Sequence, residues 1–370
     1  NPRSHPSETA RPRAAAPVSW LATSLALALT LIVSLVATHP SPAAAATSVL
    51  LGDKGELWQR NGRLPHVYNV GYRGGAAPPL TLPITRSVRQ FGALGDGVAD
   101  DTEAFQAALD AKPAGVVWVP KGTYRITASL RIRQSGVVLR GAAGGTVLRA
   151  CPQLTAGPVP TNTKAMLLIS PNAGADSVVT TVAADAVRGD THLVVSGSKA
   201  IKPGDRLILT MTDTATYTLR SHLEGASNAG CQESPLVVRL PVRIAAVNGN
   251  VVTLKQPLRH DVRKSWQARL IKGPLLHSVG LQDLELQRAD PTVSPADAGL
   301  AHGVVVADSV DVWMSGVTVA NMDHSITLNR VRHAELTNIT ATGYRLSQVL
   351  GLSASSDVWV RNLSIAQVAF

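Results

Sequence analysis

A set of ionisable residues in the second half of the sequence has the types and spacing for proton-transfer chemistry. These residues are Asp290, Asp297, His302, Asp323, His324, Tyr344 and Arg345. The best combination joins "NMDHS", which contains Asp323 and His324, to "TGYR", which contains Tyr344 and Arg345. If adjacent loops converge, they bring together an acid, an imidazole and a cation. Such a group could remove a proton next to a carboxylate group while Arg345 holds the charge. The alternative is that each is an ordinary solvated loop residue.

A repeated pattern predicts the elements that must position these residues. Eight-residue segments align without gaps, and each is two short alternating strands on either side of one bend residue. They are "VWMSGVTV" (312–319), "AELTNITA" (334–341), "VWVRNLSI" (358–365) and, more weakly, "VGLQDLEL" (279–286). The bend residues are Gly316, Asn338, Asn362 and Asp283. Gly and Asn enter the left-handed backbone region at low cost, so a single residue can turn the chain there.

A further short strand precedes each of the three clear copies, at 304–306, 326–328 and 350–352, with offsets of 22 and 24 residues. Three short strands per rung at this spacing predict a parallel β-solenoid. The candidate residues then lie in loops beside the first strand of each rung. Asn338 and Asn362 begin glycosylation sequons, but we expect them to point inward and stack as a ladder between rungs.

Three aspartates stand just before a predicted helix in "FGALGDGVADDTEAFQAAL" (91–109). Asp96 begins a turn dipeptide, and Asp100 or Asp101 is placed to cap the helix. The spacing fails the EF-hand pattern, so a structural role is favoured over a catalytic or metal-binding one. The helix has one apolar stripe that suits it to cover the first rung. That stripe consists of Phe105, Ala108 and Leu109.

Residues 173–272 differ in character from the segments on either side. Longer alternating strands such as "IKPGDRLILT" and "VRIAAVNGNVVTL" appear there, and the Asn-Gly pair at 248–249 is a hairpin signal. We expect a small antiparallel β module inserted between rungs. The first part of the β-helix, with its capping helix, then covers 88–172. The later rungs cover 273–370, which ends without an evident polar cap and is expected to be truncated.

Residues 1–46 are predicted to be a secretory signal peptide. A basic start with three arginines precedes the uncharged run 20–37, and small residues follow. Cleavage would leave a secreted, extracellular protein with an extended lead-in at 47–87. The uncharged run is long enough to span a bilayer, so a membrane-anchored protein is an alternative, and an organelle transit peptide is another.

Composition narrows the classes of fold and partner. Of 370 residues, 45% are hydrophobic and only 4% aromatic, which suits a stacked β-rich interior. The net charge of +10 is spread along the chain and fits a polyanionic partner. The sequence has no basic-aromatic cluster and no zinc-finger spacing, which argues against nucleic acid. Cys151 and Cys231 could pair in an oxidising compartment or remain two buried thiols.

Three stretches near the start of the predicted solenoid resemble a known family. They are "VRQFGALGDGVADDTEAFQAAL", "GVVWVPKGTYRI" and "GVVLRGAAGGTVL". This is similar to the N-terminal signature of the rhamnogalacturonase/epimerase-like branch of the pectate-lyase superfamily, and the likeness covers about residues 88–150. "GRLPHVYNVGYRGG" (62–75) is similar to the lead-in of some members. The resemblance implies a right-handed parallel β-helix.

The resemblance implies carbohydrate chemistry without fixing the reaction, because members include hydrolases, lyases, epimerases and proteins that only bind glycans. Family active sites usually lie on the outer face of the first strand of each rung and in the loops beside it. The outward positions here are Val305, Thr327 and Gly351, and none is acidic. This argues against a polygalacturonase-type hydrolase, which needs two carboxylates.

Together these features predict a secreted lyase or hydrolase acting on an acidic cell-wall polysaccharide. Its catalytic candidates are Asp323, His324, Arg345, His302 and Tyr344. The alternative is a non-catalytic glycan-binding or structural wall protein. We expect no cofactor, with calcium a possibility for a lyase, and no nucleic-acid partner. A membrane association is expected only if the leader is uncleaved, and the protein is expected to be a monomer.

Overall fold

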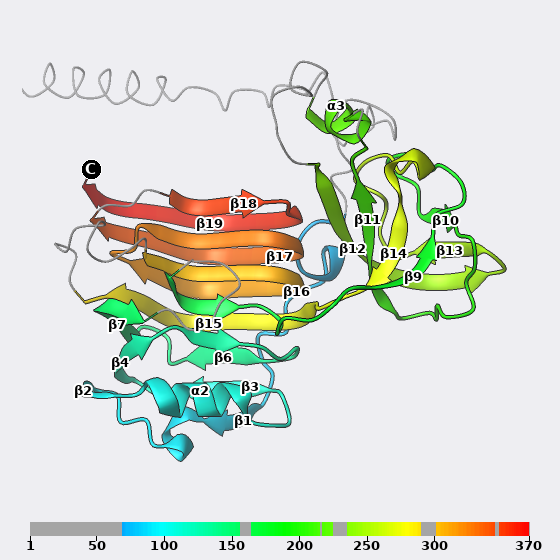
Figure 1. Ribbon diagram of the computed structural model, residues 1–370. Coiled ribbons are helices and arrows are strands. Elements are labelled where there is room, and N and C mark those ends of the chain that lie inside the picture. Colours follow the sequence, from blue (N-terminus) through cyan, green and yellow to red (C-terminus); the bar gives the residue numbers. More distant parts are fainter. Residues whose placement is uncertain are drawn as a thin grey trace, which may run out of the picture. The chain divides into compact units, whose positions relative to one another are not determined.

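The computed structural model describes residues 69–155, 164–214, 217–224, 235–289, 301–344 and 348–369. All of them belong to the compact unit Arg60–Phe370. Strands dominate this unit, as Figure 1 shows. The helical elements are short: η1 (Tyr72–Gly74), η2 (Val88–Phe91), α2 (Thr102–Asp110), α3 (Thr218–Glu224) and η4 (Lys264–Trp266).

The strands form two sheets. A 13-stranded, parallel-paired stack contains β1 (Ile84–Ser87), β2 (Asp96–Asp100), β3 (Val116–Val119), β4 (Gly122–Ala128), β5 (Leu130–Ile132), β6 (Val138–Gly141), β7 (Thr146–Thr155), β8 (Lys164–Ile169), β15 (Leu276–Arg288), β16 (Ala301–Ala320), β17 (His324–Tyr344), β18 (Gln348–Ser353) and β19 (Ser356–Ala369). A six-stranded antiparallel sheet contains β9 (Ser177–Thr181), β10 (His192–Val194), β11 (Arg206–Thr212), β12 (Val237–Asn248), β13 (Val251–Leu254) and β14 (Arg269–Lys272).

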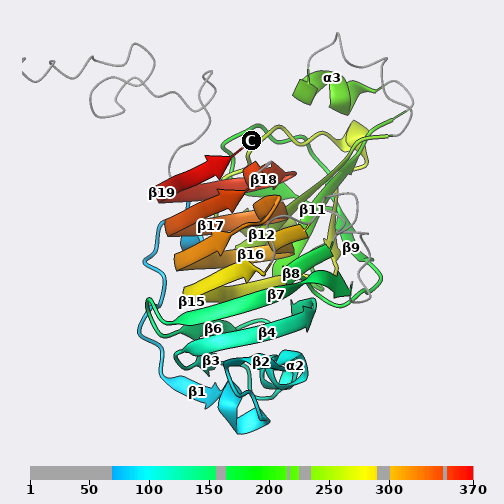
Figure 2. The same ribbon diagram turned by 90° about the vertical axis from the view of Figure 1, so that its left-hand side faces the viewer.

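Successive rungs of the stack pair in parallel and in register. β15 lies beside β16, β16 beside β17, and β17 beside both β18 and β19. Figures 1 and 2 show these strands as superposed layers. Val304 pairs with Ile326, and Ile326 with Leu350. The offsets of 22 and 24 residues are therefore confirmed, and the chain is all-β and mostly parallel, as predicted.

Each rung turns at its predicted bend residue. Gly316, Asn338, Asn362 and Asp283 have φ values of 66°, 54°, 53° and 53°, in the left-handed region that Gly and Asn enter most easily. Asn362 Nδ2 donates a hydrogen bond to Asn338 Oδ1 at 2.8 Å. The stacking of the two asparagines is therefore confirmed.

The prediction that Asn338 and Asn362 point inward is wrong, because both side chains are exposed. The reason lies in the bend itself. Leu336 and Ile339 both belong to the core, whereas a regular strand would place residues three apart on opposite faces. The left-handed residue resets the alternation, so the ladder lies on the outer surface of the stack.

One apolar core runs through the inside of the stack. Helix α2 contributes Phe105, Ala108 and Leu109, the predicted apolar stripe, and all three are buried. Phe105 meets Tyr124 of β4 edge to face, with ring centroids 5.1 Å apart. The apolar stripe is therefore the surface by which the helix packs on the first rungs.

The three aspartates before α2 bind backbone amides, as the structural interpretation predicted. Asp96 accepts from two amides of its own turn at 2.8 and 2.9 Å. Asp100 accepts from the amide of Thr102, the first helical residue, at 3.1 Å. Asp101 occupies the N-cap position but makes no side-chain capping bond. Its carboxylate instead accepts from two amides of the preceding loop at 2.6 and 3.2 Å.

The antiparallel sheet has the strand order β10-β13-β12-β11-β14-β9 and an apolar core of its own. Its strands fall between β8 and β15 in the chain. β12 and β13 form the hairpin that the Asn-Gly pair indicated. Asn248 pairs with Val251, and Gly249 in the turn has φ 54°.

A buried ion cluster joins the later rungs to the antiparallel sheet. Arg332 Nε donates to Asp357 at 2.7 Å, and both side chains are 1% exposed. The other guanidinium nitrogens of Arg332 donate to the backbone oxygens of Pro241 at 2.8 Å and Pro257 at 2.9 Å. Asp357 also pairs with Arg259. The cluster therefore links β17 and β19 to β12 and to the segment after β13.

The segment before β1 runs along the outside of the stack, as the blue trace in Figure 2 shows. The N–H of Gly71 donates to the backbone oxygen of Asp357 in β19 at 2.9 Å. Towards the first rungs, Arg140 of β6 donates to the backbone oxygen of Leu80 at 2.9 Å. This lead-in segment therefore contacts both early and late rungs.

Several predicted features lie outside the described residues. They include the leader 1–46, the first part of the lead-in and Cys231, so the Cys151–Cys231 pairing stays a prediction. Among the described helices, none is long and apolar enough to cross a membrane.

Candidate functional site

A cavity of about 600 Å³ opens on the outer face of β8, β16 and β17. Leu168, Val305 and Thr327 line it from three successive rungs and are paired in register. The outward orientation predicted for Val305 and Thr327 is therefore confirmed. Residues 170–174 and Arg239 of β12 line the same cavity. Its volume falls in the range of about 300–1,000 Å³ that is typical of small-molecule sites.

His302, His324 and Gln348 form a ladder on the same three-strand face, which we call the histidine ladder. His302 lines the cavity, and it pairs in register with His324, which pairs with Gln348. The two imidazoles stack with centroids 4.5 Å apart and planes at 16°. His302 Nδ1 lies 3.4 Å from Thr327 Oγ1, and His324 Nδ1 lies 3.1 Å from Gln348 Oε1. The spacing of adjacent strands, about 4.8 Å, imposes this stacking.

The surroundings of the ladder decide which nitrogen can accept a proton. Burial, with a smaller contribution from the neighbouring His324, lowers the pKa of His302 to about 4. His302 is therefore neutral at pH 7. The side-chain oxygen of Gln348 can only accept a hydrogen bond, so it selects the His324 tautomer with the proton on Nδ1. In this tautomer the lone pair is on Nε2, which can accept a proton.

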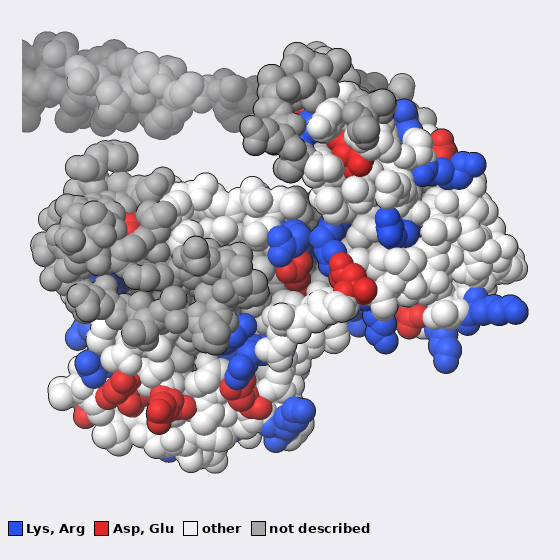
Figure 3. Space-filling view, viewed as in Figure 1, with Lys and Arg blue, Asp and Glu red and all other residues white. Residues whose placement is uncertain are grey.

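Two ion pairs line the cavity beside the ladder. Arg330 binds Asp308 through two nitrogens, each at 2.6 Å. Arg239 binds Asp176 at 2.5 and 3.1 Å. The hydrogen bond that Arg330 donates to Asp308 raises the pKa of Arg330, and the hydrogen bond that Asp176 accepts from Arg239 lowers the pKa of Asp176. In Figure 3 basic and acidic atoms meet where the stack adjoins the antiparallel sheet. Each of these guanidinium groups is thus balanced by a carboxylate.

The structure brings two of the predicted residues together and places a third behind them. His302 and His324 lie in strands β16 and β17 rather than in loops, because these strands begin earlier than the apolar pattern indicated. Asp323 is buried, and its carboxylate lies 3.7 Å from Arg288 Nη1. Its charge partly opposes the lowering of the His302 pKa. Asp323 therefore acts on the ladder from behind and does not line the cavity.

The side chains of the other candidates belong to parts of the chain that are not described. Tyr344 is the last residue of β17, but its side chain lies outside the described part of the structure, as do Arg345, Asp290 and Asp297. Within the described residues, no group of three or more His, Cys, Asp or Glu side chains is arranged to hold a metal ion.

Sequence reasoning missed Gln348 and the pair Asp308–Arg330, although the repeat points to both. The members of the histidine ladder are separated by 22 and 24 residues, the same offsets as the rungs. Asp308 and Arg330 are also 22 residues apart. The pair Asp176–Arg239 gave no such signal, because its members belong to segments that are not related by the repeat.

Comparison with known proteins supports the resemblance described above. The sequence profile of the family "Rhamnogalacturonase A/epimerase, pectate lyase-like" matches residues 85–222. Mannuronan C5-epimerases AlgE5 and AlgE4 of Azotobacter vinelandii are 41% and 44% identical over 73 residues, 17% of this chain and 7% and 13% of those proteins. Alginate lyase 7 of the same organism is 37% identical over 73 residues, 17% of this chain and 8% of that protein. The resemblance is confirmed, and the chain spans only a small part of the length of these relatives.

Two solved structures illustrate more distant likeness. The tailspike protein gp49 of Pseudomonas phage LKA1 is 16% identical, with 75% of this chain and 50% of that chain covered and a TM-score of 0.48. The A-module of Azotobacter vinelandii mannuronan C5-epimerase AlgE4 is 16% identical, with 76% and 51% covered and a TM-score of 0.36. At these TM-scores the two neighbours add nothing to the fold described above.

Proposed function

We propose that the protein is a carbohydrate-active β-helix enzyme that removes the C5 proton from a uronate residue of an acidic polysaccharide. Sequence similarity to proteins named mannuronan C5-epimerase and alginate lyase supports this substrate class. Inversion at C5 and elimination from a uronate begin with the same step, the loss of the proton next to the carboxylate. The proposal therefore names the step that both reactions share.

The observation that carries the proposal is the histidine ladder beside the cavity. A base must lie within reach of the proton that it removes, and it must be unprotonated at the working pH. Gln348 holds the His324 ring with Nε2 free, and the stacked His302 is neutral because its pKa is about 4. The ladder thus supplies an oriented base on an outer face that can receive a polysaccharide chain.

The proposed reaction balances as follows. His324 Nε2 takes the C5 proton, and the electron pair of the C–H bond moves into the carboxylate to give an enolate. Delivery of a proton from water to the opposite face inverts C5, and His324 releases the first proton to solvent. Expulsion of the oxygen substituent at C4, which takes up a proton from water, instead gives a 4,5-unsaturated uronate. Arg330, which lines the same cavity, supplies a cation that can be shared between Asp308 and the substrate carboxylate.

The test is incubation with polymannuronate, alginate and polygalacturonate in D₂O, with and without calcium. An epimerase should place deuterium at C5 of the inverted residue, which nuclear magnetic resonance detects, whereas a lyase should give the ultraviolet absorbance of a 4,5-unsaturated uronate. The variant His324→Ala should show neither. New reducing ends with neither deuterium at C5 nor that ultraviolet absorbance would identify a hydrolase and overturn the proposed step.

A non-catalytic glycan-binding protein is the second candidate, and one observation favours it. Ala165, Leu168 and Val305 form a buried apolar cluster on the outer face of the first strands, where an enzyme of this type would place polar groups. Retention of the protein on immobilised polymannuronate, with no deuterium incorporation and no cleavage, would favour this candidate.

We also propose an organisation that builds on the described elements. Helix α2 acts as the N-terminal cap, the sheet of β9–β14 is a module inserted into the β-helix, and the coil is right-handed. The chain is secreted as a monomer after removal of residues 1–46. N-terminal sequencing of the mature protein tests the cleavage, because an uncleaved leader in a membrane fraction would favour an anchor.

A further inference from the structure

A second cavity, of about 420 Å³, opens between the antiparallel sheet, the lead-in segment and the outer face of β16 and β17. It shares no lining residue with the cavity beside the histidine ladder. We call it the basic cavity, because its lining contains four arginine or lysine side chains and only one carboxylate. These residues are Arg73, Arg206, Arg243, Lys255 and Asp311. A histidine also lines it.

Two of the basic residues face each other directly across the antiparallel sheet. Arg206 of β11 pairs in register with Arg243 of β12. Residues opposite each other on antiparallel strands point to the same face with Cβ atoms about 4.5–5.5 Å apart, and like charges in this arrangement repel. Asp311 offsets part of this repulsion, since its Oδ2 lies 3.6 Å from Arg206 Nη2. Within the described residues, Arg243 has no ion-pair partner.

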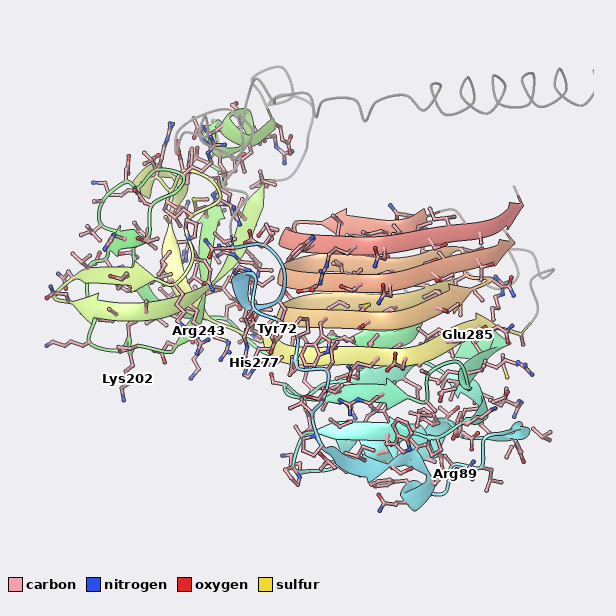
Figure 4. All side chains as sticks on the ribbon, turned by 180° about the vertical axis from the view of Figure 1, so that it is seen from behind. Tyr72, Arg89, Lys202, Arg243, His277 and Glu285 are labelled. Carbon is pink, nitrogen blue, oxygen red and sulfur yellow. The ribbon has the colours of Figure 1, made fainter. Side chains whose placement is uncertain are left out.

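The remaining cations approach from other segments. Arg73 of the lead-in segment donates to Ser278 Oγ at 3.3 Å, and its guanidinium lies 5.1 Å from the ring centre of Tyr72. The backbone N–H of Lys255 donates to the backbone oxygen of Arg243 at 2.8 Å. Figure 4 shows Arg243, Tyr72 and His277 where the antiparallel sheet adjoins the stack. Three separate parts of the chain thus direct positive charge into one concave space.

This electrostatic arrangement is unfavourable without an anion. Burial and the neighbouring cations Arg243 and Arg73 lower the pKa of Arg206, and Asp311 opposes this effect. Burial is also the largest cause that lowers the pKa of His277, and the same two cations lower it further. An anionic ligand would relieve the repulsion, and a carboxylate matches the paired donors of a guanidinium. Val242, Val310 and Leu275 add apolar lining suited to a sugar ring.

We propose that the basic cavity is a second glycan-binding site, which takes a carboxylate-bearing saccharide at a place separate from the histidine ladder. The volume of the cavity limits the occupant to a short stretch of sugar. The proposal shares only its ligand class with the proposed function, because it requires no catalysis. A chain held in the basic cavity would keep the polysaccharide near the enzyme between reactions at the ladder.

The test uses the protection of lysines from acetylation, because this readout locates the ligand. Lys255 lines the basic cavity, and Lys202 is an exposed lysine in the segment just before β11 that lies outside it (Figure 4). The full chain carrying His324→Ala is acetylated briefly with and without an oligomannuronate of three residues, and modified peptides are quantified by mass spectrometry. The oligomannuronate should slow acetylation of Lys255 at least about threefold and leave Lys202 unchanged.

Two further arms separate the possible ligands and sites. A neutral trisaccharide should give no protection, and inorganic sulfate should protect Lys255 only at much higher concentration, since it supplies charge without the sugar. Arg206→Gln/Arg243→Gln should abolish protection by the oligomannuronate, whereas the matched exposed variant Arg89→Gln should retain it. Equal protection by sulfate at the same concentration would assign the site to small free anions and overturn the glycan proposal.

The proposal also fails if the oligomannuronate protects Lys255 and Lys202 equally, or if the double variant is protected like the parent. These outcomes are independent of turnover, because every arm is carried out without His324. Absence of epimerase or lyase activity in the wild type would therefore overturn the proposed function alone. Circular dichroism of the double variant checks that it is folded.

Discussion

The cavity beside the histidine ladder and the basic cavity are both lined by β12, and they differ in whether their arginines are paired with carboxylates. In the first, Arg239 and Arg330 are each bound by a carboxylate, and His302 is held neutral. In the second, Arg206 and Arg243 face each other, and Asp311 pairs with Arg206.

The difference separates two uses of arginine. A guanidinium that is already paired has a fixed position, so it can shape a site and orient a reacting group at little electrostatic cost. A guanidinium that faces another cation raises the energy of the free protein and lowers the energy of a complex with an anion. The first arrangement suits chemistry on a bound sugar, and the second suits capture of one.

Disruption of the buried ion cluster should produce the largest effect on stability. It also tests the comparison, because the cluster binds β12, which lines both cavities. Asp357→Ala leaves Arg332 and Arg259 buried without their shared carboxylate. Loss of one partner from a buried ion pair costs about 3–5 kcal/mol of the free energy of unfolding. Urea unfolding followed by fluorescence measures this loss, with the exposed Glu103→Gln as the control. A wild-type midpoint for Asp357→Ala would show that the cluster does not secure the wall that the cavities share.

The next largest effect should separate the two cavities by activity. His324→Ala removes the proposed base and should reduce kcat by about 100-fold or more, while the KM for polymannuronate changes little. The exposed His192→Ala is the matched control and should keep wild-type rates. Full activity in His324→Ala would remove the ladder from the mechanism and leave the comparison without its catalytic side.

A pH experiment compares the histidines of the two cavities. His302 lines the first and His333 the second, and burial is the main cause that lowers their pKa values to about 4 and about 3. The unfolded chain binds these protons near pH 6.5, so the free energy of unfolding should fall as the pH drops from about 6.5 towards 3.

Urea unfolding at pH 7.5 and pH 3.5 measures the effect, because the two imidazoles differ in protonation only below about pH 4. His333→Gln should reduce the difference between the two pH values more than His302→Gln, because His333 is the more deeply buried and the more strongly shifted. A larger reduction in His302→Gln would reverse the assignment of the more strongly desolvated imidazole to the basic cavity.

The smallest effect should have the opposite sign. Arg243→Gln removes one of two like charges that face each other, so it should raise the free energy of unfolding by about 0.5 kcal/mol at low salt. The gain should shrink in high salt, where the repulsion is screened. Arg89→Gln is the control. A loss of stability at low salt would mean that Arg243 contributes through packing rather than adding to a surplus of charge.

The parallel stack was predictable because the length of the sequence repeat in a solenoid determines which residues pair between rungs. Rungs related by 22 and 24 residues pair as those offsets require, and residue type identified the left-handed bends. The direction of Asn338 was not predictable from alternation, because the bend itself resets the alternation. Orientation at such a position depends on the neighbouring core residues, which one strand pattern does not encode.

The candidate site was predictable only in the part that repeats. His302 and His324 were found by residue type, and the repeat offset links them to Gln348. The basic cavity follows no period, because it joins Arg73 of the lead-in segment to two strands of a separate sheet. Nothing in the local sequence indicates that these segments meet, and only the assembled fold brings their charges together.

The lead-in segment has a consequence for the order in which the chain folds. Gly71 precedes every rung, yet its N–H binds the backbone oxygen of Asp357 in β19. A contact between such distant positions carries a large loop-closure cost until the intervening rungs have formed. The segment should therefore dock last, after the rungs of the stack have formed. In pulse-labelling hydrogen exchange, the Gly71 amide should gain protection after the amides of β16 and β17, and earlier protection would contradict this order.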